Sequence, residues 1–214
     1  MKLKFVIDKK YDKKFVNKKY LNLFNDRYKT SMKYLELSKK LYQKSWDEIN
    51  DQFSKYIEKG TGYKWFYKEY KCVLSVIHSG MSNWGYKPII IRSWKENPYS
   101  MRRITAHELI LSHYFEIYKR HYKKEGLTEG QVWALAEISA FALTSLSKDV
   151  KKWWPWNTGY YTNHNYPHIV KLQNQLKKPF LELSFDDYIK KGIKLVKKYP
   201  EMWPTYAKRK KEKN

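Results

Sequence analysis

Hydrophobic and polar positions along the chain predict a few short strands. Residues 2–8, KLKFVID, alternate between apolar and polar side chains, as a half-buried strand does. Residues 63–80 are rich in aromatic and β-branched side chains, and residues 87–94, KPIIIRSW, form a second apolar run. The MSNWGY segment between these runs has the composition of a loop. We therefore expect a small sheet in the first half of the chain.

Helical spacing of apolar residues dominates the remaining segments. The repeat of three to four residues predicts helices over residues 31–62, 100–124, 128–148 and 184–199. Ser45, with Glu48 three residues later, resembles a capping box and predicts a break in the first of these segments. The lysine-rich residues 8–24 predict either a basic amphipathic helix or a loosely attached arm. This order predicts an α+β fold in which a small sheet precedes a packed pair of helices and helices predominate.

The length and composition are those of one globular domain with short appendages. The chain has 214 residues, of which 42% are hydrophobic and 18% aromatic, enough to form a buried core. We expect a basic N-terminal arm over residues 1–30, a main domain over 31–206 and a disordered basic tail over 207–214.

Cysteine content and the N-terminal sequence favour a reducing compartment. Cys72 is the only cysteine, which excludes an internal disulfide and a four-cysteine zinc site. The first residues are charged and lack the apolar stretch of a signal peptide, and no run of about 18 apolar residues predicts a transmembrane helix. We therefore expect a cytoplasmic protein without a membrane partner.

A formal net charge of +23 would attract phosphate backbones and acidic surfaces. The lysines occur as scattered pairs and not as one dense stripe, which favours a solvated surface over a phosphate-binding one. The charge therefore leaves nucleic acid open as a partner without requiring it.

The segment HELILSH, residues 107–113, contains the main candidate chemistry. His107 and Glu108 have the arrangement of a zinc ligand followed by a general base on one helix. The second ligand of such a site lies four residues after the first, and here that position holds Leu111. His113 is six residues after His107, about 120° around a regular helix. It could bind the same ion only if the helix ended early, kinked or contained a π-bulge.

Glu137 is the second candidate, because it is the only charged residue in the apolar stretch 132–146. A buried carboxylate needs a partner, so Glu137 is either a metal ligand or part of an ion pair or hydrogen bond. His107, Arg102 and Arg103 are the candidate partners for such a pair. If zinc is bound, the predicted ligands are His107, Glu137 and His113.

Part of the chain resembles zincin-like metallopeptidases of the gluzincin type, in particular small uncharacterised archaeal, bacterial and viral proteins. The resemblance runs from about Trp46 to Leu146. It rests on WDEINDQFSKYIEKGTGYKW, VLSVIHS, KPIIIRSW, ITAHELILSHYF and ALAEISAFAL. It implies a zincin-like fold in which an edge strand and an aliphatic strand precede a His-Glu helix and a Glu-bearing helix. It further implies zinc bound by His107 and Glu137, Glu108 as the base, and a peptide or protein as substrate. The second ligand of the family pattern falls on Leu111.

Two aromatic segments add candidates of lower specificity. The stretch GYYTNHNYPH, residues 159–168, contains His164 and His168 beside three tyrosines. Any of these could stabilise an oxyanion or replace the missing ligand, or the stretch could be a hydrogen-bonded loop. The WWPW motif, residues 153–156, could stack on bases, or could form core packing at a bend between helices.

Three functions therefore stay open at this point. The first is a metal-dependent hydrolase, a peptidase in which Glu108 activates a zinc-bound water. The second is a non-catalytic binding protein on the same fold, since Leu111 removes a ligand. The third is a basic nucleic-acid-binding protein in which the His-Glu pair is incidental.

Overall fold

The computed structural model describes residues 1–82, 88–156, 166–200 and 202. It divides into two compact units. Unit 1 contains Met1–Tyr56 and Lys64–His113, and unit 2 contains Ile57–Tyr63 and Tyr114–Asn214. The positions of the chain's parts relative to one another are not determined, so each unit is described by itself.

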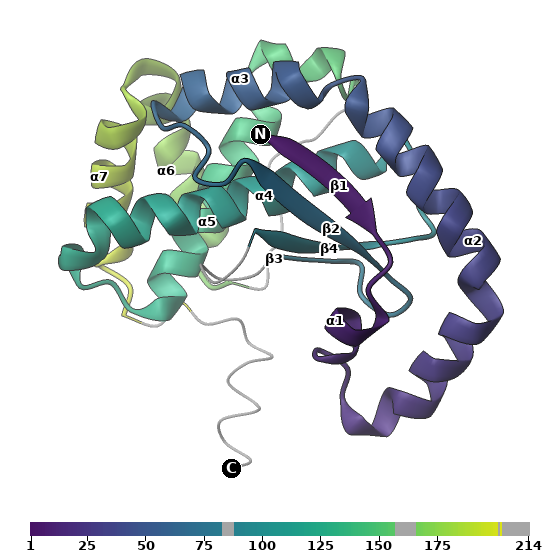
Figure 1. The fold of residues 1–214 in the computed structure, drawn as a ribbon. Helices are drawn as coiled ribbons and strands as arrows, with labels where there is room; N and C mark the ends of the chain where they lie inside the picture. The colour runs from purple at the N-terminus through teal and green to yellow at the C-terminus, as the bar shows by residue number, and fades with distance from the viewer. Residues whose placement is uncertain (83–87, 157–165, 201, 203–214) are drawn as a thin grey trace. The chain divides into compact units, whose positions relative to one another are not determined.

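Unit 1 is built on a mixed sheet, whose strand order among the described residues is β1-β2-β4-β3 (Figure 1). The strands are β1 (Lys2–Val6), β2 (Glu69–Ser75), β3 (Gly80–Ser82) and β4 (Ile89–Ser93). The first, second and fourth strands run parallel, and β3 pairs antiparallel with β4 at the edge. β2 and β4 are buried over most of their length because they lie in the interior of the sheet.

The other edge of the sheet, β1, lies beside the long helix α2 (Leu21–Asp47). Between them in the chain are the short helix α1 (Lys9–Lys13) and the 3-10 turn η1 (Lys18–Tyr20). Asp8 caps α1, because its carboxylate accepts a hydrogen bond from Tyr11 N at 2.8 Å. The N-terminal half of α2 lies beside α1, as Figure 1 shows.

Two helices begin in unit 1 and end in unit 2. They are α3 (Asn50–Thr61) and α4 (Met101–Ile117). α4 starts after Asn97, whose carbonyl accepts from Met101 N at 3.0 Å and whose side chain accepts from Tyr99 N at 2.9 Å.

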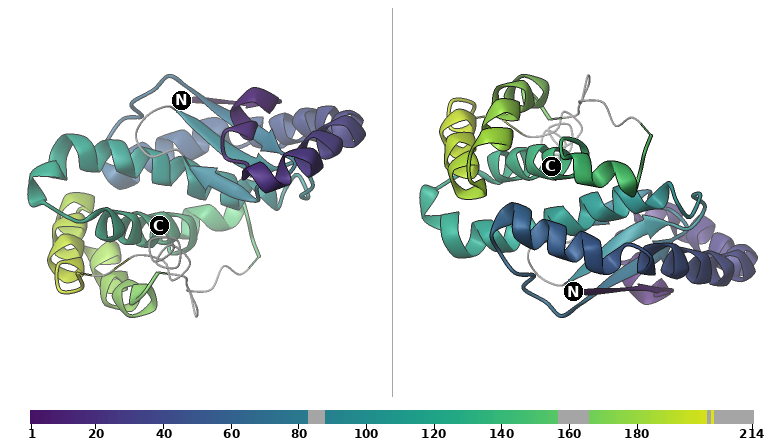
Figure 2. Two further views of the ribbon diagram at one scale, coloured as in Figure 1. Left: turned by 90° about the horizontal axis from the view of Figure 1, so that it is seen from below. Right: turned by 90° about the horizontal axis from the view of Figure 1, so that it is seen from above.

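Unit 2 is helical in its described part. α4 is followed by the π-helical turn η2 (Tyr118–Tyr122) and the 3-10 turn η3 (Lys123–Glu125), which ends at Gly126 with φ of 66°. α5 (Glu129–Ser145) begins at a capping box between Thr128 and Gln131 and is followed by the 3-10 turn η4 (Lys148–Lys152). α6 (Ile169–Glu182) and α7 (Phe185–Val196) pack side by side and against α5 (Figure 2).

The predicted α+β class with helices predominating is confirmed. Ser184 caps the last helix, as its spacing to Asp187 indicates. The predicted break in residues 31–62 is present, since α2 ends at Asp47 and the next helix begins at Asn50. Ser45 is not its cap, because it lies inside α2 and its hydroxyl donates to Pro98 O at 2.7 Å. β3 and α6 are additions that the hydrophobic pattern did not predict.

The predicted domain division stays a prediction, although α2 runs continuously across its boundary at residues 30 and 31. The expected tail, residues 207–214, lies outside the described residues.

Candidate functional site

The His-Glu pair lies in the middle of α4. His107 is half-buried, whereas 7% of Glu108 and 2% of Leu111 remain exposed to solvent. Leu111 belongs to the apolar core, with Leu109 and Ile110 beside it in sequence. The position where the pattern requires a second ligand therefore holds a buried aliphatic side chain.

Glu108 lies close to a buried arginine of β4. A Cβ atom placed on Gly80 of β3 would be 2.5 Å from Arg92 Nη1 and 2.8 Å from Glu108 Oε1. The guanidinium nitrogen and the carboxylate oxygen are thus no more than 5.3 Å apart, the sum of the two distances. Opposite charges at this separation stabilise each other in a buried environment. The glycine provides the space in which the two groups meet.

Arg92 is the centre of a polar network inside unit 1. Its side chain is 2% exposed, and it donates from Nη1 to Ser79 O and from Nη2 to both carboxylate oxygens of Glu96, at 2.6 and 2.5 Å. The backbone of Glu96 is fixed in turn by Tyr42, whose hydroxyl donates to Glu96 O at 2.9 Å and accepts from Glu96 N at 2.7 Å. This network anchors the loop after β4 to α2.

Burial determines the titration of the groups around this network. Burial raises the pKa of Glu96, and the nearby Arg92 opposes that rise. Burial also raises the pKa of Tyr42 to about 12. The Cys72 thiol is completely buried, which raises its pKa although Arg92 opposes the shift. At neutral pH we therefore expect a protonated thiol and a protonated phenol beside the ion pair.

His113, the third predicted ligand, lies in an aromatic environment in unit 1. Its ring is 4.6 Å from that of Trp65 and 5.2 Å from that of Phe66, and 1% of the residue is exposed. α4 is a regular α-helix from Met101 to Ile117, and the π-helical turn begins only at Tyr118. His113 therefore points about 120° away from His107 around the helix axis. Its assignment as a zinc ligand stays a prediction.

Glu137 lies on α5 and is half-buried. It belongs to unit 2, whereas His107 belongs to unit 1, so the structure does not test whether the two side chains bind one ion. Of the proposed alternative partners, Arg102 is engaged within unit 1, where it donates to Ser45 Oγ at 2.9 Å and pairs with Glu48. The role of Glu137 as a ligand stays a prediction.

The aromatic segments of unit 2 are only partly described. His164 and the tyrosines at 160 and 161 lie outside the described residues. His168 precedes α6 with φ of 64° and stacks on Tyr199 at 4.3 Å. In the WWPW motif, Trp153 and Trp154 are buried, and Trp154 Nε1 donates to Thr144 O at 2.8 Å. These two tryptophans form core packing, whereas Trp156 is 40% exposed.

Sequence reasoning missed Arg92, although a signal for it is present. Arg92 interrupts the aliphatic run of residues 87–94, as Glu137 interrupts its own apolar stretch. A charged side chain in such a run needs a buried partner, and the structure provides Glu96.

Among the described residues, no group of three or more His, Cys, Asp or Glu side chains is placed to hold a metal ion. Within the same residues, no helix is both long and apolar enough to cross a membrane. Comparisons with models of protein families, with curated proteins and with solved structures found no match to the chain.

Proposed function

We propose that this chain is a non-catalytic binding protein on a zincin-like frame, in which α4 has a structural role. The observation that carries the proposal is Leu111, which occupies the second-ligand position and is 2% exposed. A leucine has no donor atom for a metal, and its burial among core residues leaves no space for a water in its place.

The neighbouring side chains on α4 support the same conclusion. A catalytic zinc needs about three protein ligands and an open position for water. In unit 1 this face of α4 offers His107, while His113 points elsewhere and packs on two aromatic rings. Glu108, the residue expected as the base, lies beside the Arg92 guanidinium and so has a structural partner. These residues fit a zinc site poorly, and we derive no reaction step through a metal.

A metal-dependent hydrolase is the second candidate, and the order of elements favours it. An antiparallel edge strand, β3, and the aliphatic strand β4 precede the helix that carries His107 and Glu108, and the next helix carries Glu137. In that case His107, Glu137 and His113 would hold zinc, and Glu108 would accept a proton from water.

Metal content distinguishes the two candidates. The protein is purified without added zinc, then titrated with zinc, and analysed by elemental mass spectrometry beside His107→Ala and Leu111→His. We expect wild type to hold no more zinc than His107→Ala, because a single histidine binds the ion weakly. Leu111→His adds a second donor and should hold more, with circular dichroism used to confirm that it is folded.

One zinc per wild-type chain that is lost in His107→Ala would overturn the proposal. It would establish a site with a displaced ligand, and peptide substrates would then be worth testing.

A further inference from the structure

The long helix α2 has two apolar faces, and the fold uses only one of them. The buried face contains Phe24, Tyr28, Leu35, Tyr42 and Trp46, all 1% exposed or less. A second set of apolar residues on the same helix is exposed to solvent. Four of them are Leu23 at 42%, Tyr34 at 56%, Leu37 at 54% and Leu41 at 43%, whereas Met32, at 42%, lies about 180° away from Leu23 around the helix.

These four exposed residues lie on one side of the helix, which we call the α2 seam. Its apolar positions are adjacent only from Tyr34 to Leu41, because Arg27 and Thr30 lie on the same side between Leu23 and Tyr34. At about 100° per residue, Leu23, Tyr34, Leu37 and Leu41 fall within an arc of about 60°. Leu35, on the buried face, is about 160° away from Leu37 around the helix. The steps of three and four residues from Tyr34 to Leu41 are those of a seam between two packed helices.

One flank of the α2 seam carries positive charge that no ion pair between described residues neutralises. Lys33, Lys40 and Lys44 are exposed there, and none of them forms an ion pair with another described residue. Three carboxylates nearby have other partners. Glu36 pairs with Lys39 at 2.5 Å, Glu48 pairs with Arg102, and Asp47 Oδ1 accepts from Gln43 Nε2 at 2.8 Å. The seam therefore offers an apolar surface beside three cations that form no ion pair in the described part of the chain.

The opposite flank is formed by the loop after β4. Trp94 stacks on Tyr34 with ring centroids 6.0 Å apart, and it extends the apolar surface beyond the helix. Because Tyr34 stays 56% exposed, this contact does not cover the seam.

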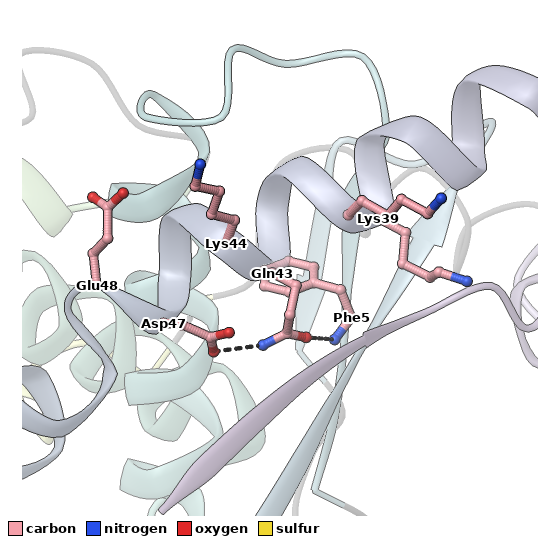
Figure 3. A pocket seen from close by; sticks show the side chains of 7 residues that line it. Phe5, Lys39, Gln43, Lys44, Asp47 and Glu48 are labelled. Atoms are coloured by element: carbon pink, nitrogen blue, oxygen red, sulfur yellow. Dashed lines mark hydrogen bonds between the residues drawn. The ribbon is translucent and has the colours of Figure 1, made fainter.

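The lysine flank borders a groove of about 550 Å³ between α2 and β1 (Figure 3). Gln43 closes the edge of β1 there: its Oε1 accepts from Phe5 N at 2.9 Å, and its Nε2 donates to Leu3 O at 3.0 Å. A partner strand cannot add to backbone groups that are already bonded. A partner at this side of unit 1 is therefore expected to bind the helix and not the strand edge.

We infer that the α2 seam is a docking surface for an acidic amphipathic helix of a partner protein. The inference deepens the proposed function, since it rests on that binding role and names its surface and its class of partner. Leucines on the partner would cover Leu37 and Leu41, and carboxylates beside them would pair with the three lysines. A second copy of the chain is disfavoured because each copy carries +23. Nucleic acid would satisfy the lysines but would not cover the leucines.

The probe is a fluorescein-labelled synthetic peptide of about three heptads, with leucine at a and d and glutamate at most other positions. Its glutamates keep it from pairing with itself, and a peptide of the same composition in scrambled order is the control. Binding to the full chain is measured by fluorescence anisotropy at several salt concentrations. We expect the amphipathic peptide to bind and the scrambled peptide to bind at least about tenfold more weakly.

Matched variants locate the site. Leu37→Asp/Leu41→Asp should weaken peptide binding by about tenfold or more, whereas Leu181→Asp/Leu183→Asp at the C-terminal end of α6 should not. The control pair is as exposed, at 59% and 44%, and changes the charge equally. A second comparison tests the charges. Lys33→Gln/Lys40→Gln/Lys44→Gln should reduce the salt dependence of peptide binding. The same change at three exposed lysines of α6 and α7 should reduce it less; these are Lys178, Lys191 and Lys194.

Four results would overturn the inference. Equal losses in the two aspartate pairs, or equal binding of the two peptides, would show attraction by net charge alone. Self-association that Leu37→Asp/Leu41→Asp abolishes in sedimentation would identify a second copy as the occupant. Tighter binding of a single-stranded DNA oligonucleotide than of the peptide, lost in the same pair, would identify nucleic acid.

Zinc content is measured in the same preparations, so the two proposals fail separately. Bound zinc with peptide binding at the seam overturns only the non-catalytic role. If the protein binds neither zinc nor the peptide, only the docking surface is overturned.

Discussion

Replacing Arg92 by methionine should destabilise unit 1, because it removes the partner of a largely buried carboxylate. The guanidinium bonds to Ser79 O and to both oxygens of Glu96, and it lies within 5.3 Å of Glu108. Removing one member of a buried charge pair costs about 3–5 kcal/mol, because the other charge stays poorly solvated. Since 27% of the Glu96 side chain is exposed, we expect a loss near the lower end, about 3 kcal/mol.

Alkylation of Cys72 is the assay, because this single thiol reports the opening of unit 1. Cys72 is 0% exposed on β2, and Leu74 of the same strand pairs in register with Arg92. Labelling is followed across a urea series, since urea is uncharged and does not screen the ion pair. Arg92→Met should shift the labelling midpoint to lower urea by an amount that corresponds to this loss.

Two further variants test the electrostatic origin of the effect. Arg92→Met/Glu96→Gln should cost less than the sum of the single changes, with a coupling energy of about 1–3 kcal/mol. Arg27→Met makes the same change in net charge at an exposed position and should cost about 1 kcal/mol or less. A loss below about 1 kcal/mol in Arg92→Met, equal to that of the control, would refute the reasoning.

Three other predictions follow from individual side chains. Cys72 in the native protein should resist iodoacetamide at neutral pH, because burial both covers the thiol and raises its pKa; rapid labelling without denaturant would contradict this. Burial also raises the pKa of Asp12 above its ordinary 3.8, so the folded state holds this proton more tightly. Stability should therefore fall as pH rises from 3.8 through the raised value. Asp12→Asn should lack that part of the pH dependence in urea midpoints, and parallel curves for the two proteins would disprove the assignment. Ser184→Ala should lower the free energy of unfolding by about 1 kcal/mol, because the hydroxyl caps α7 by accepting from Asp187 N. An unchanged thermal midpoint would contradict the role of this cap.

The elements of the fold that the sequence predicts are those with a strong local signal. KLKFVID and KPIIIRSW form β1 and β4 because aliphatic side chains fill the sheet interior. Thr128 and Gln131 mark the start of α5 through their reciprocal capping bonds. β3 has three residues and is held by pairing with β4, so its own sequence has no period to detect. Tertiary contacts of this kind are not visible in a local pattern.

The site was predicted from the identity and spacing of residues, and these do not determine which side chains surround a residue in the fold. The sequence identifies His107, Glu108 and the substitution at Leu111, but it cannot show that Glu108 approaches Arg92 across Gly80. That contact joins three separate elements and depends on the register of β3 against β4, in which Gly80 pairs with Arg92. His113 illustrates the same limit, because its aromatic neighbours come from the segment before β2.

The two helices most relevant to function use their side chains in opposite ways. On α4, Glu108 lies beside a buried arginine and Leu111 lies in the core, so these residues serve the interior of unit 1. On α2, one face is buried in the core, whereas the leucines of the α2 seam stay 42% to 54% exposed to solvent. Exposed apolar stripes of this kind favour association, and the lysines beside this one are without a counter-charge among the described residues. A binding role that is independent of α4 is therefore consistent with both helices, and it places the surface to be tested on α2.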